Sequence, residues 1–354
     1  MITVLLPLLL AQAAAAQSAG RTRADARSPS EIVAAAPPPD WLAVAAEDLL
    51  IMELAPGAGG RARRVAIQLM PAPFSQGWVA NIRLLARARW WDGLSVNRVQ
   101  DNYVVQWGDA SEKKPLPAGL KVLGEDAYVA RGLLAIPDPR GRPRINYNLG
   151  AAIMRNAMIA ANGSVVVSEA FKEALANGKA EPSALPEPKI GDAYASVASF
   201  VYGWPIAGQT GKAGDGFWPV HCYAAVGVGR NLSPDTGTGA ELYTVIGHAP
   251  RHLDRNIAVV GRVVEGIEHL SSLPRGTEAL GFYKTAAERT AIRSIRLASD
   301  LPAAERPRFQ YLSTESASFA AYADARANRR DAFFIQPAGG ADICNVPVPV
   351  RRVP

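Results

Sequence analysis

Cysteine and histidine are scarce in this chain of 354 residues, which contains only two cysteines and four histidines. Metal centres usually need three or four such side chains at short spacings. His248 and His252 are four residues apart, but Pro250 lies between them and interrupts the helix that would bring both rings to one face. Because no Cys or Glu completes a zinc set, the sequence predicts no metal site and no cofactor. The other histidines, His221 and His269, are interpreted as ordinary surface or helix-end residues.

Motifs for a nucleophile or a bound phosphate are also lacking. Ser233, His252 and Asp254 could be combined into a triad on paper, but no Gly-x-Ser-x-Gly turn accompanies them, and a polar loop is the better interpretation. Lys212 follows a glycine, yet Ala213 stands where a phosphate-binding loop requires Ser or Thr. Triad hydrolysis and nucleotide binding are therefore not expected.

No concentrated basic surface stands out either. The chain has 38 Lys and Arg against 32 Asp and Glu, a formal charge of +6, but the arginines are scattered and not interleaved with aromatic residues. Proteins that bind nucleic acid concentrate such charge on one face or in a recognised motif. The excess indicates a soluble basic surface, and we expect no nucleic-acid partner. Apolar residues make up 49% of the chain, enough for a sizeable core.

The N-terminus has the pattern of a signal peptide over residues 1–16. A leucine-rich run over 2–11 is followed by alanines up to Ala16, although no Lys or Arg precedes the run. About ten apolar residues cannot cross about 30 Å of hydrocarbon as a helix. We expect a periplasmic or secreted protein with no stable membrane insertion after cleavage. In such a compartment Cys222 and Cys344 are candidates for a disulfide, and the alternative is one buried and one free thiol.

The next segments alternate between polar linker and regular structure. Residues 17–40 are rich in Ala, Ser, Arg and Pro without apolar periodicity, which predicts a disordered linker. Residues 49–54 and 65–70 have strand composition around a glycine-rich turn. Trp78, Ile82 and Leu85 then recur at helical spacing. The order predicts an antiparallel pair followed by one amphipathic helix.

Residues 91–109 read as strand, turn and strand, and they carry the most informative side chains. If the second strand is regular, Tyr103 and Val105 face one side, and Val104 and Gln106 face the other. Arg98 comes from the preceding strand. An Arg fork, an aromatic ring and an amide on neighbouring strands suit an extended peptide, because the Arg donates to carbonyls while the ring packs on apolar groups.

The rest of the chain divides into an insert, a second set of strands and an extension. Residues 147–161 and 168–177 have helical composition, and 181–189 form a proline-rich break, so 110–217 is expected to be an inserted, partly helical lobe. Strands are expected at 222–228, 241–247, 257–266 and 291–298, and a second helix is expected around Val264, Ile267, Leu270 and Leu273. Residues 313–330 read as a helix, and 332–354 as an extended tail.

The pattern Asp92-Gly93-Leu94, Arg98, Tyr103, Gln106 and Gly108-Asp109 resembles the signature of the cyclophilin-type prolyl isomerases. A second match is Leu253-Asp254 before a strand that ends Gly-x-Val-x-Glu-Gly at Gly266. The resemblance covers about 47–109 and 220–298. It implies a mainly β fold, a closed eight-stranded antiparallel barrel capped by two helices. The implied domains are a cyclophilin-like domain over 41–300, interrupted by the insert, and a C-terminal extension over 301–354 with one helix.

The resemblance also assigns roles to individual residues. Arg98 takes the catalytic position, and the substrate-binding positions are Tyr103, Val104, Gln106, Glu241, Leu242, Tyr243, His252 and Leu253. Some of these depart from the family: Glu241 stands where Gln is usual, Leu242 where an aromatic is usual, and His252 where cyclosporin-sensitive members have Trp. Ile257 replaces a common His.

The expected function is peptidyl-prolyl cis-trans isomerisation of X-Pro bonds in exported proteins, with proline-containing polypeptides as clients. The alternative is a catalytically weak or inactive module that binds proline-containing segments, because half of the site is altered. A third reading makes the barrel a platform for the insert and the tail. Arg98 favours the first, since a pure binder has no need of a guanidinium at the prolyl nitrogen. The sequence indicates no particular oligomeric state.

Overall fold

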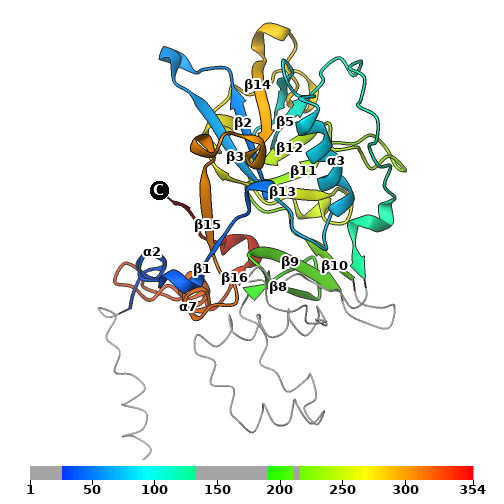
Figure 1. Ribbon diagram of the computed structural model, residues 1–354. Coiled ribbons are helices and arrows are strands. Elements are labelled where there is room, and N and C mark those ends of the chain that lie inside the picture. The colour runs from blue at the N-terminus through cyan, green and yellow to red at the C-terminus, as the bar shows by residue number, and fades with distance from the viewer. Residues whose placement is uncertain (1–25, 132–189, 210–215, 354) are drawn as a thin grey trace, which may run out of the picture.

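The computed structural model describes residues 26–131, 190–209 and 216–353, and its largest unit is a closed barrel of eight antiparallel strands. Around the barrel the strands follow the order β11-β12-β5-β4-β14-β2-β3-β13. Their bounds are β2 (Leu49–Leu54), β3 (Arg63–Leu69), β4 (Ser95–Val99), β5 (Val104–Gly108), β11 (Ala225–Val228), β12 (Leu242–Val245), β13 (Val259–Glu265) and β14 (Thr290–Leu297). Closure leaves no unpaired strand edge. The predicted mainly β barrel is confirmed (Figure 1).

Helix α3 (Gln76–Arg87) covers the barrel as the helical spacing predicted. Trp78, Ile82 and Leu85 on one face are fully buried, while Arg83 on the other face pairs with Asp48. The second helix is much shorter than predicted: α6 (Glu268–Ser271) has four residues. The apolar spacing from residue 264 is misleading because β13 continues to 265, so the first residue of that pattern lies in a strand.

A second lobe lies against one end of the barrel and is seen below it in Figure 1. Its sheet has the order β6-β10-β9-β8, from β6 (Ala130–Arg131), β8 (Val197–Val201), β9 (Trp204–Gln209) and β10 (Gly216–Pro219). A short parallel pair joins β7 (Ile190–Gly191) to β16 (Ala341–Asp342). The regular structure in the described part of the 110–217 insert is thus mostly strand, and the helices predicted at 147–161 and 168–177 lie outside the described residues.

Helices α2 (Pro29–Ala34) and α7 (Ala317–Ala327) pack together in this lobe. The prediction of disorder over 17–40 is wrong for its second half. Ser28 and Glu31 form a capping box at the start of α2, and Ile32 is buried in an apolar cluster with Phe319. The signal was present in the sequence, because Ser-Pro-Ser-Glu has the spacing of such a box. Residues 1–25, with the predicted signal peptide, lie outside the described part.

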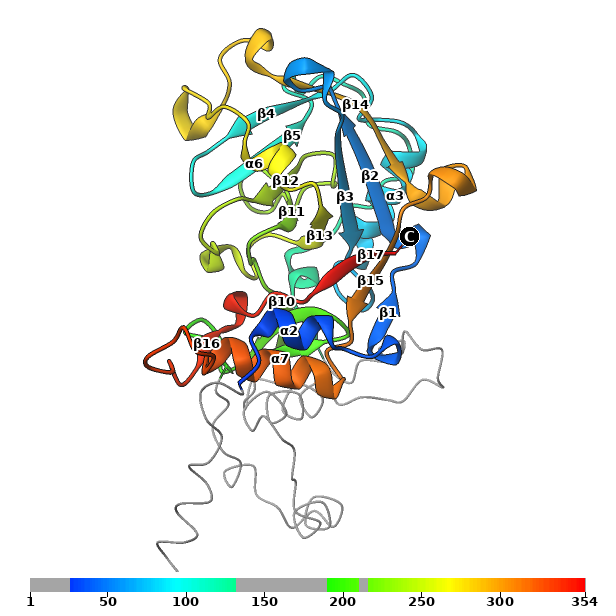
Figure 2. The same ribbon diagram turned by 90° about the vertical axis from the view of Figure 1, so that its left-hand side faces the viewer.

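The C-terminal extension ties the second lobe to the barrel. A three-stranded sheet has the order β1-β15-β17, from β1 (Trp41–Ala43), β15 (Arg308–Leu312) and β17 (Val350–Val353), and Figure 2 shows it running between the two bodies. Helix α7 confirms the predicted helix within 313–330, and β17 is the extended end of the tail. Strand β15 was not predicted. A disulfide joins Cys222 and Cys344, which confirms that pairing.

Short 3-10 turns complete the described structure: η2 (Pro38–Asp40), η3 (Ala46–Asp48), η4 (Ala58–Gly60), η5 (Glu125–Tyr128), η7 (Arg251–Leu253), η8 (Ala279–Gly281), η9 (Ala286–Glu288), η10 (Ala298–Asp300), η11 (Ala303–Glu305) and η12 (Ile343–Asn345). Among the described residues, every helix is too short or too polar to cross a membrane.

Candidate active site

The site is built on one row of paired positions across four neighbouring strands. Arg98 on β4 lies opposite Gln106 on β5, Gln106 lies opposite Tyr243 on β12, and Tyr243 lies opposite Gly227 on β11. Directly opposed residues of antiparallel strands project to the same face of the sheet. We call these four residues the site row.

A β-bulge brings Arg98 into the site row. Val96 pairs with Trp107, and the next pair is Arg98 with Gln106, so Asn97 is an extra residue on β4. Val96 and Trp107 are fully buried in the barrel interior. Without the bulge, strict alternation would place Arg98 on that interior face as well. The extra residue re-aims the guanidinium to the face of Gln106, a common use of bulges beside functional sites.

Arg98 is held by three hydrogen bonds. Its Nε donates to the carbonyl oxygen of Leu280 at 2.7 Å, and its Nη1 donates to Oε1 of Gln106 at 3.2 Å. Its Nη2 donates to Oε1 of Gln100. Burial lowers the pKa of Arg98 from its ordinary value of 12.5, but an arginine in a protein stays charged.

Two aromatic rings flank this guanidinium. Its central carbon lies 5.6 Å from the centre of the Tyr103 ring and 5.4 Å from that of Phe282, both within cation–π range. A single bridge pairs Phe282 with Arg98. Sequence reasoning missed Phe282 and Leu280, because no local pattern relates them to a strand about 180 residues earlier. Gln100 could have been predicted, since it lies two residues after Arg98 and a strand places such residues on the same face.

Tyr103 reaches the site because it precedes the strand. Strand β5 starts at Val104, and Asn102 has a positive φ of 50°, so the alternation predicted for Tyr103 does not apply to it. The Tyr103 ring stacks on the ring of His252, with centres 6.3 Å apart. This contact joins the Arg98 side of the site to η7, which also carries Leu253.

The other proposed binding positions on β5 and β12 differ in orientation. Val104 lies opposite Val245, two residues from Gln106, and so shares the face of the site row as predicted. Leu242 lies opposite Trp107 and is 1% exposed, so it belongs to the barrel interior. The assignment of Leu242 to the pocket wall is therefore wrong, because neighbouring residues of a strand face opposite sides.

Glu241 lies at the end of β12 beside two amides. Its Oε2 accepts hydrogen bonds from Nδ2 of Asn97 at 3.4 Å and from Nε2 of Gln106 at 3.5 Å. Gln106 thus donates to Glu241 and accepts from Arg98, which fixes the orientation of its amide. Burial raises the pKa of Glu241 above its ordinary value of 4.5, although the two amides oppose the shift.

The Tyr243 side of the site is buried and polar. Nε2 of His221 lies 2.8 Å from the Tyr243 hydroxyl, and its Nδ1 lies 2.9 Å from Oδ1 of Asp254. His221 is 0% exposed, so its interpretation as a surface or helix-end residue is wrong. Asp254 is hydrogen-bonded to His221 and not to His252, the histidine of the triad considered from the sequence. Sequence reasoning missed His221 because it lies in the connection between β10 and β11, and no local pattern relates that segment to Tyr243 or Asp254.

Comparison with known proteins gives the family. Residues 65–296, well over half of the chain, match the family model described as cyclophilin type peptidyl-prolyl cis-trans isomerase/CLD. Cyclophilin AquaCyp293 from Hirschia baltica has a similar structure, with a TM-score of 0.56 at 20% identity over 89% of this chain and 94% of that one. A cyclophilin type isomerase from Cryptosporidium parvum, solved in the presence of the dipeptide Ala-Pro, aligns with a TM-score of 0.33 at 8% identity over 70% and 98%. No curated protein matches the chain. The chain therefore belongs to the cyclophilin-type peptidyl-prolyl cis-trans isomerase family.

Proposed function

We propose that this protein accelerates cis-trans isomerisation of X-Pro peptide bonds, with Arg98 as the catalytic residue. The observation that carries the proposal is the placement of Arg98 by the β4 bulge on the same face as Gln106 and Tyr243. Isomerisation needs no nucleophile or cofactor, because the barrier of about 18–20 kcal/mol comes from amide resonance. Uncatalysed X-Pro exchange takes tens to hundreds of seconds.

Arg98 is suited to stabilise the twisted amide. A guanidinium carries five N–H groups, of which three donate to Leu280, Gln106 and Gln100. One N–H on each terminal nitrogen therefore has no acceptor among the described residues. As the amide twists, its nitrogen lone pair is no longer delocalised and becomes an acceptor. A donor aimed at that nitrogen binds the twisted state more strongly than the planar one, and a thousandfold gain requires only about 4 kcal/mol.

Two tyrosine rings and a leucine are proposed to hold the prolyl ring. Tyr103 borders the guanidinium, Leu253 packs partly buried against the core, and Tyr243 lies in the site row. A prolyl ring seated there would displace water from Arg98, which would strengthen the interaction between its charge and the amide nitrogen. The amide of Gln106, already oriented by its neighbours, is placed to contact the substrate backbone.

The alternative is a module that binds proline-containing segments without useful turnover. It is favoured by the carboxyl group of Glu241, which lies beside Gln106 where the family usually has an amide. A charged group there would attract basic peptides and compete for the donors of Gln106. Under this alternative Arg98 would contribute to affinity and not to the rate.

The clients in this proposal are proline-containing segments of exported polypeptides. The apolar run over 2–11 followed by alanines supports export. The Cys222–Cys344 disulfide agrees with it, since structural disulfides persist mainly in oxidising compartments.

A protease-free isomerisation assay on a series of proline tetrapeptides tests the proposal. The proteins compared are the wild type, Arg98→Ala, Arg98→Lys and the control Arg87→Ala, which removes an exposed arginine of α3 paired with Asp300. Arg98→Ala should lose about 10²–10³-fold in kcat/KM, as expected for a preorganised donor. Arg98→Lys should not restore the rate, because it lacks the planar fork, and Arg87→Ala should match the wild type.

Peptide affinity measured on the same proteins separates the two candidate functions. Loss of rate with retained binding in Arg98→Ala supports the isomerase. A wild type that binds the peptides but accelerates none of them would refute it and leave the binding module.

A further inference from the structure

The Tyr243 side of the site contains a continuous buried chain of hydrogen bonds. Tyr243 is 5% exposed, and its hydroxyl lies 2.8 Å from Nε2 of His221. Asp254, also buried, has its Oδ1 within 2.9 Å of Nδ1 of His221 and accepts a second bond from the backbone N–H of His221 at 3.0 Å. Neither His221 nor Asp254 takes part in the proposed chemistry at Arg98, so their contact with Tyr243 calls for a different role.

Asp254 fixes the role of one ring nitrogen of His221. Burial alone would raise the pKa of Asp254, but its bonds from His221 and the charge of Arg251 hold it below the ordinary value of 3.8, so it is a carboxylate. A carboxylate only accepts, so Nδ1 of His221 is the ring nitrogen that donates to it. Burial raises the pKa of Tyr243 well above 10.0, so its hydroxyl keeps its proton and bonds to Nε2 of His221 as a neutral partner.

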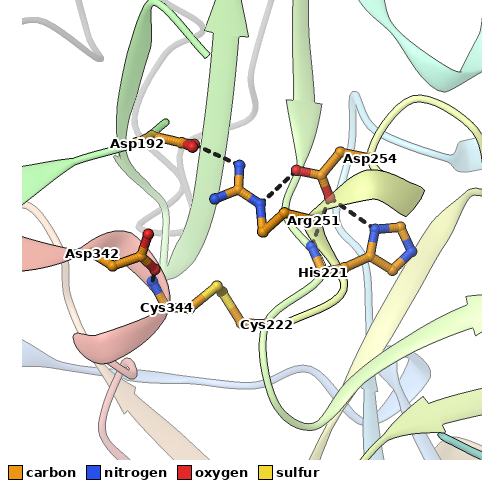
Figure 3. The surroundings of a disulfide bond; sticks show 7 residues. All are labelled: Asp192, His221, Cys222, Arg251, Asp254, Asp342 and Cys344. Atoms are coloured by element: carbon orange, nitrogen blue, oxygen red, sulfur yellow. Dashed lines mark hydrogen bonds and ion pairs between the residues drawn. A yellow bond between two sulfur atoms is a disulfide. The ribbon is translucent and has the colours of Figure 1, made fainter. Parts of the chain in front are cut away.

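The network continues to η7 and the second lobe. Oδ2 of Asp254 accepts from Nε of Arg251 at 2.7 Å, and Arg251 also pairs with Asp192, as Figure 3 shows. Arg251 immediately precedes His252 and Leu253. Cys222, which forms the disulfide with Cys344 of the tail, directly follows His221 in the chain. One polar network therefore contacts both the η7 segment and the Tyr243 ring.

We propose that Asp254 and His221 are positioning residues that fix the Tyr243 ring as a wall of the proline pocket. This inference rests on the proposed function and adds the means by which the pocket is kept in shape. The ring lies opposite Gly227 and fills the place of a side chain there, because an added Cβ would lie 2.3 Å from its Cζ and Oη atoms. Packing on the glycine backbone supports one face of the ring, and the directed bond from the hydroxyl to His221 fixes its far end.

A double-mutant cycle tests the inference. The variants are Tyr243→Phe, which removes the hydroxyl, His221→Leu, which removes both ring nitrogens, and their combination. Each single change should lower kcat/KM by about 10- to 100-fold, as for a misplaced binding wall. Because both remove the same hydrogen bond, the double variant should fall little further than the worse single variant. Independent, multiplying effects would overturn the inference.

Two further variants separate positioning from general stability. His221→Gln keeps an acceptor and should recover most of the lost activity. Tyr322→Phe is the matched control, because it removes another buried tyrosine bond, from the Tyr322 hydroxyl to the Pro347 carbonyl at 2.7 Å in the second lobe. It should lower the melting temperature without changing kcat/KM. Equal losses of activity in Tyr322→Phe and Tyr243→Phe would contradict a positioning role.

A readout without substrate keeps this test separate from the proposed function. In protein with ¹³C-labelled tyrosines, His221→Leu should shift the ring signals of Tyr243 and speed up its ring flips, while those of Tyr322 stay unchanged. This result stands even if the wild type accelerates no peptide, in which case only the proposed function fails. Unchanged Tyr243 signals in His221→Leu would overturn the inference whatever the enzyme assay gives.

Discussion

The Arg98 and Tyr243 sides of the site start from the same row of strand pairs but are held by different kinds of contact. Arg98 lies between the rings of Tyr103 and Phe282 and donates to the carbonyl oxygen of Leu280. Phe282 is 37% exposed and Leu280 is 64% exposed. Tyr243 is tied to His221, which is completely buried. The first side can adjust to a substrate because its partners are accessible. The second is fixed in advance by bonds that solvent does not reach.

This difference also divides their dependence on the rest of the chain. The Arg98 side uses the barrel, the η8 segment and the ring of His252 on η7, which stacks on Tyr103. The Tyr243 side is linked to the second lobe through Arg251 and Asp192 and lies next to the disulfide at Cys222. We therefore expect damage to the second lobe to reach Tyr243 first and Arg98 last.

Removal of the Cys222–Cys344 disulfide should have the largest effect on stability. The cysteines are 122 residues apart, so the Cys222→Ser, Cys344→Ser double variant should lose about 2–5 kcal/mol of unfolding free energy. Chemical denaturation measures this loss. Dithiothreitol should reproduce it in the wild type and have no further effect on the double variant. An unchanged denaturation midpoint would show that the bond does not support the second lobe.

A methyl group at Gly227 should damage the Tyr243 side directly. Gly227→Ala places a Cβ 2.3 Å from the Tyr243 ring, and overpacking of this kind costs about 1–3 kcal/mol. We expect lower stability together with a fall in kcat/KM. The control is Gly57→Ala, whose Cβ would meet only the movable end of Arg63. Full activity in Gly227→Ala would mean that the position of the Tyr243 ring does not matter.

The capping box of α2 tests how much this helix contributes to the stability of the second lobe. Ser28→Ala removes the acceptor for the Glu31 backbone N–H and should cost about 1 kcal/mol in thermal or chemical unfolding. Ser28→Asp keeps an acceptor and should retain stability. If Ser28→Ala is neutral, α2 does not contribute to the folded lobe, and the predicted linker would be the better description of that segment.

Replacement of Glu241, which accepts from Gln106 in the site row, should give the smallest change in stability. Its folded-state pKa is raised by burial, so its contribution to stability is full below 4.5 and is lost as pH rises through the folded-state value. Glu241→Gln should therefore be slightly more stable than the wild type at pH 7, with the difference closing below about pH 4.5. Urea unfolding at several pH values measures this.

Asp109 provides the opposite sign as a control. Burial alone would raise its pKa, but the backbone N–H of Lys114, the hydroxyl and N–H of Ser111 and the N–H of Lys113 lower it to about 2. Its stabilising contribution is present above 3.8 and is lost as pH falls through about 2, so Asp109→Asn should be less stable than the wild type at pH 7. The same sign for both variants would contradict these pKa directions.

The sequence predicted the Arg98 side far better than the Tyr243 side, for a physical reason. Arg98, Tyr103 and Gln106 lie within nine residues, so one short pattern contains them. Even there, the bulge at Asn97 could not be predicted, because alternation does not reveal an extra residue. The contact of His221 with Tyr243 joins the connection before β11 to strand β12, and no short sequence pattern contains both residues.

The insert and linker show where composition misleads. Proline and alanine around residues 29–34 suggested disorder, but Ile32 finds an apolar partner in α7. The described insert strands β8 and β9 are buried and short, and such runs are ambiguous without their neighbours. Tertiary burial decided the outcome in both segments.

The most direct test of the account is the cis-trans exchange rate of an Ala-Pro peptide measured by NMR exchange spectroscopy with catalytic amounts of protein. The account predicts rapid exchange with the wild type and exchange near the uncatalysed rate with Arg98→Ala, while both proteins bind the peptide. Equal exchange rates with the wild type and Arg98→Ala would contradict the central role given to Arg98.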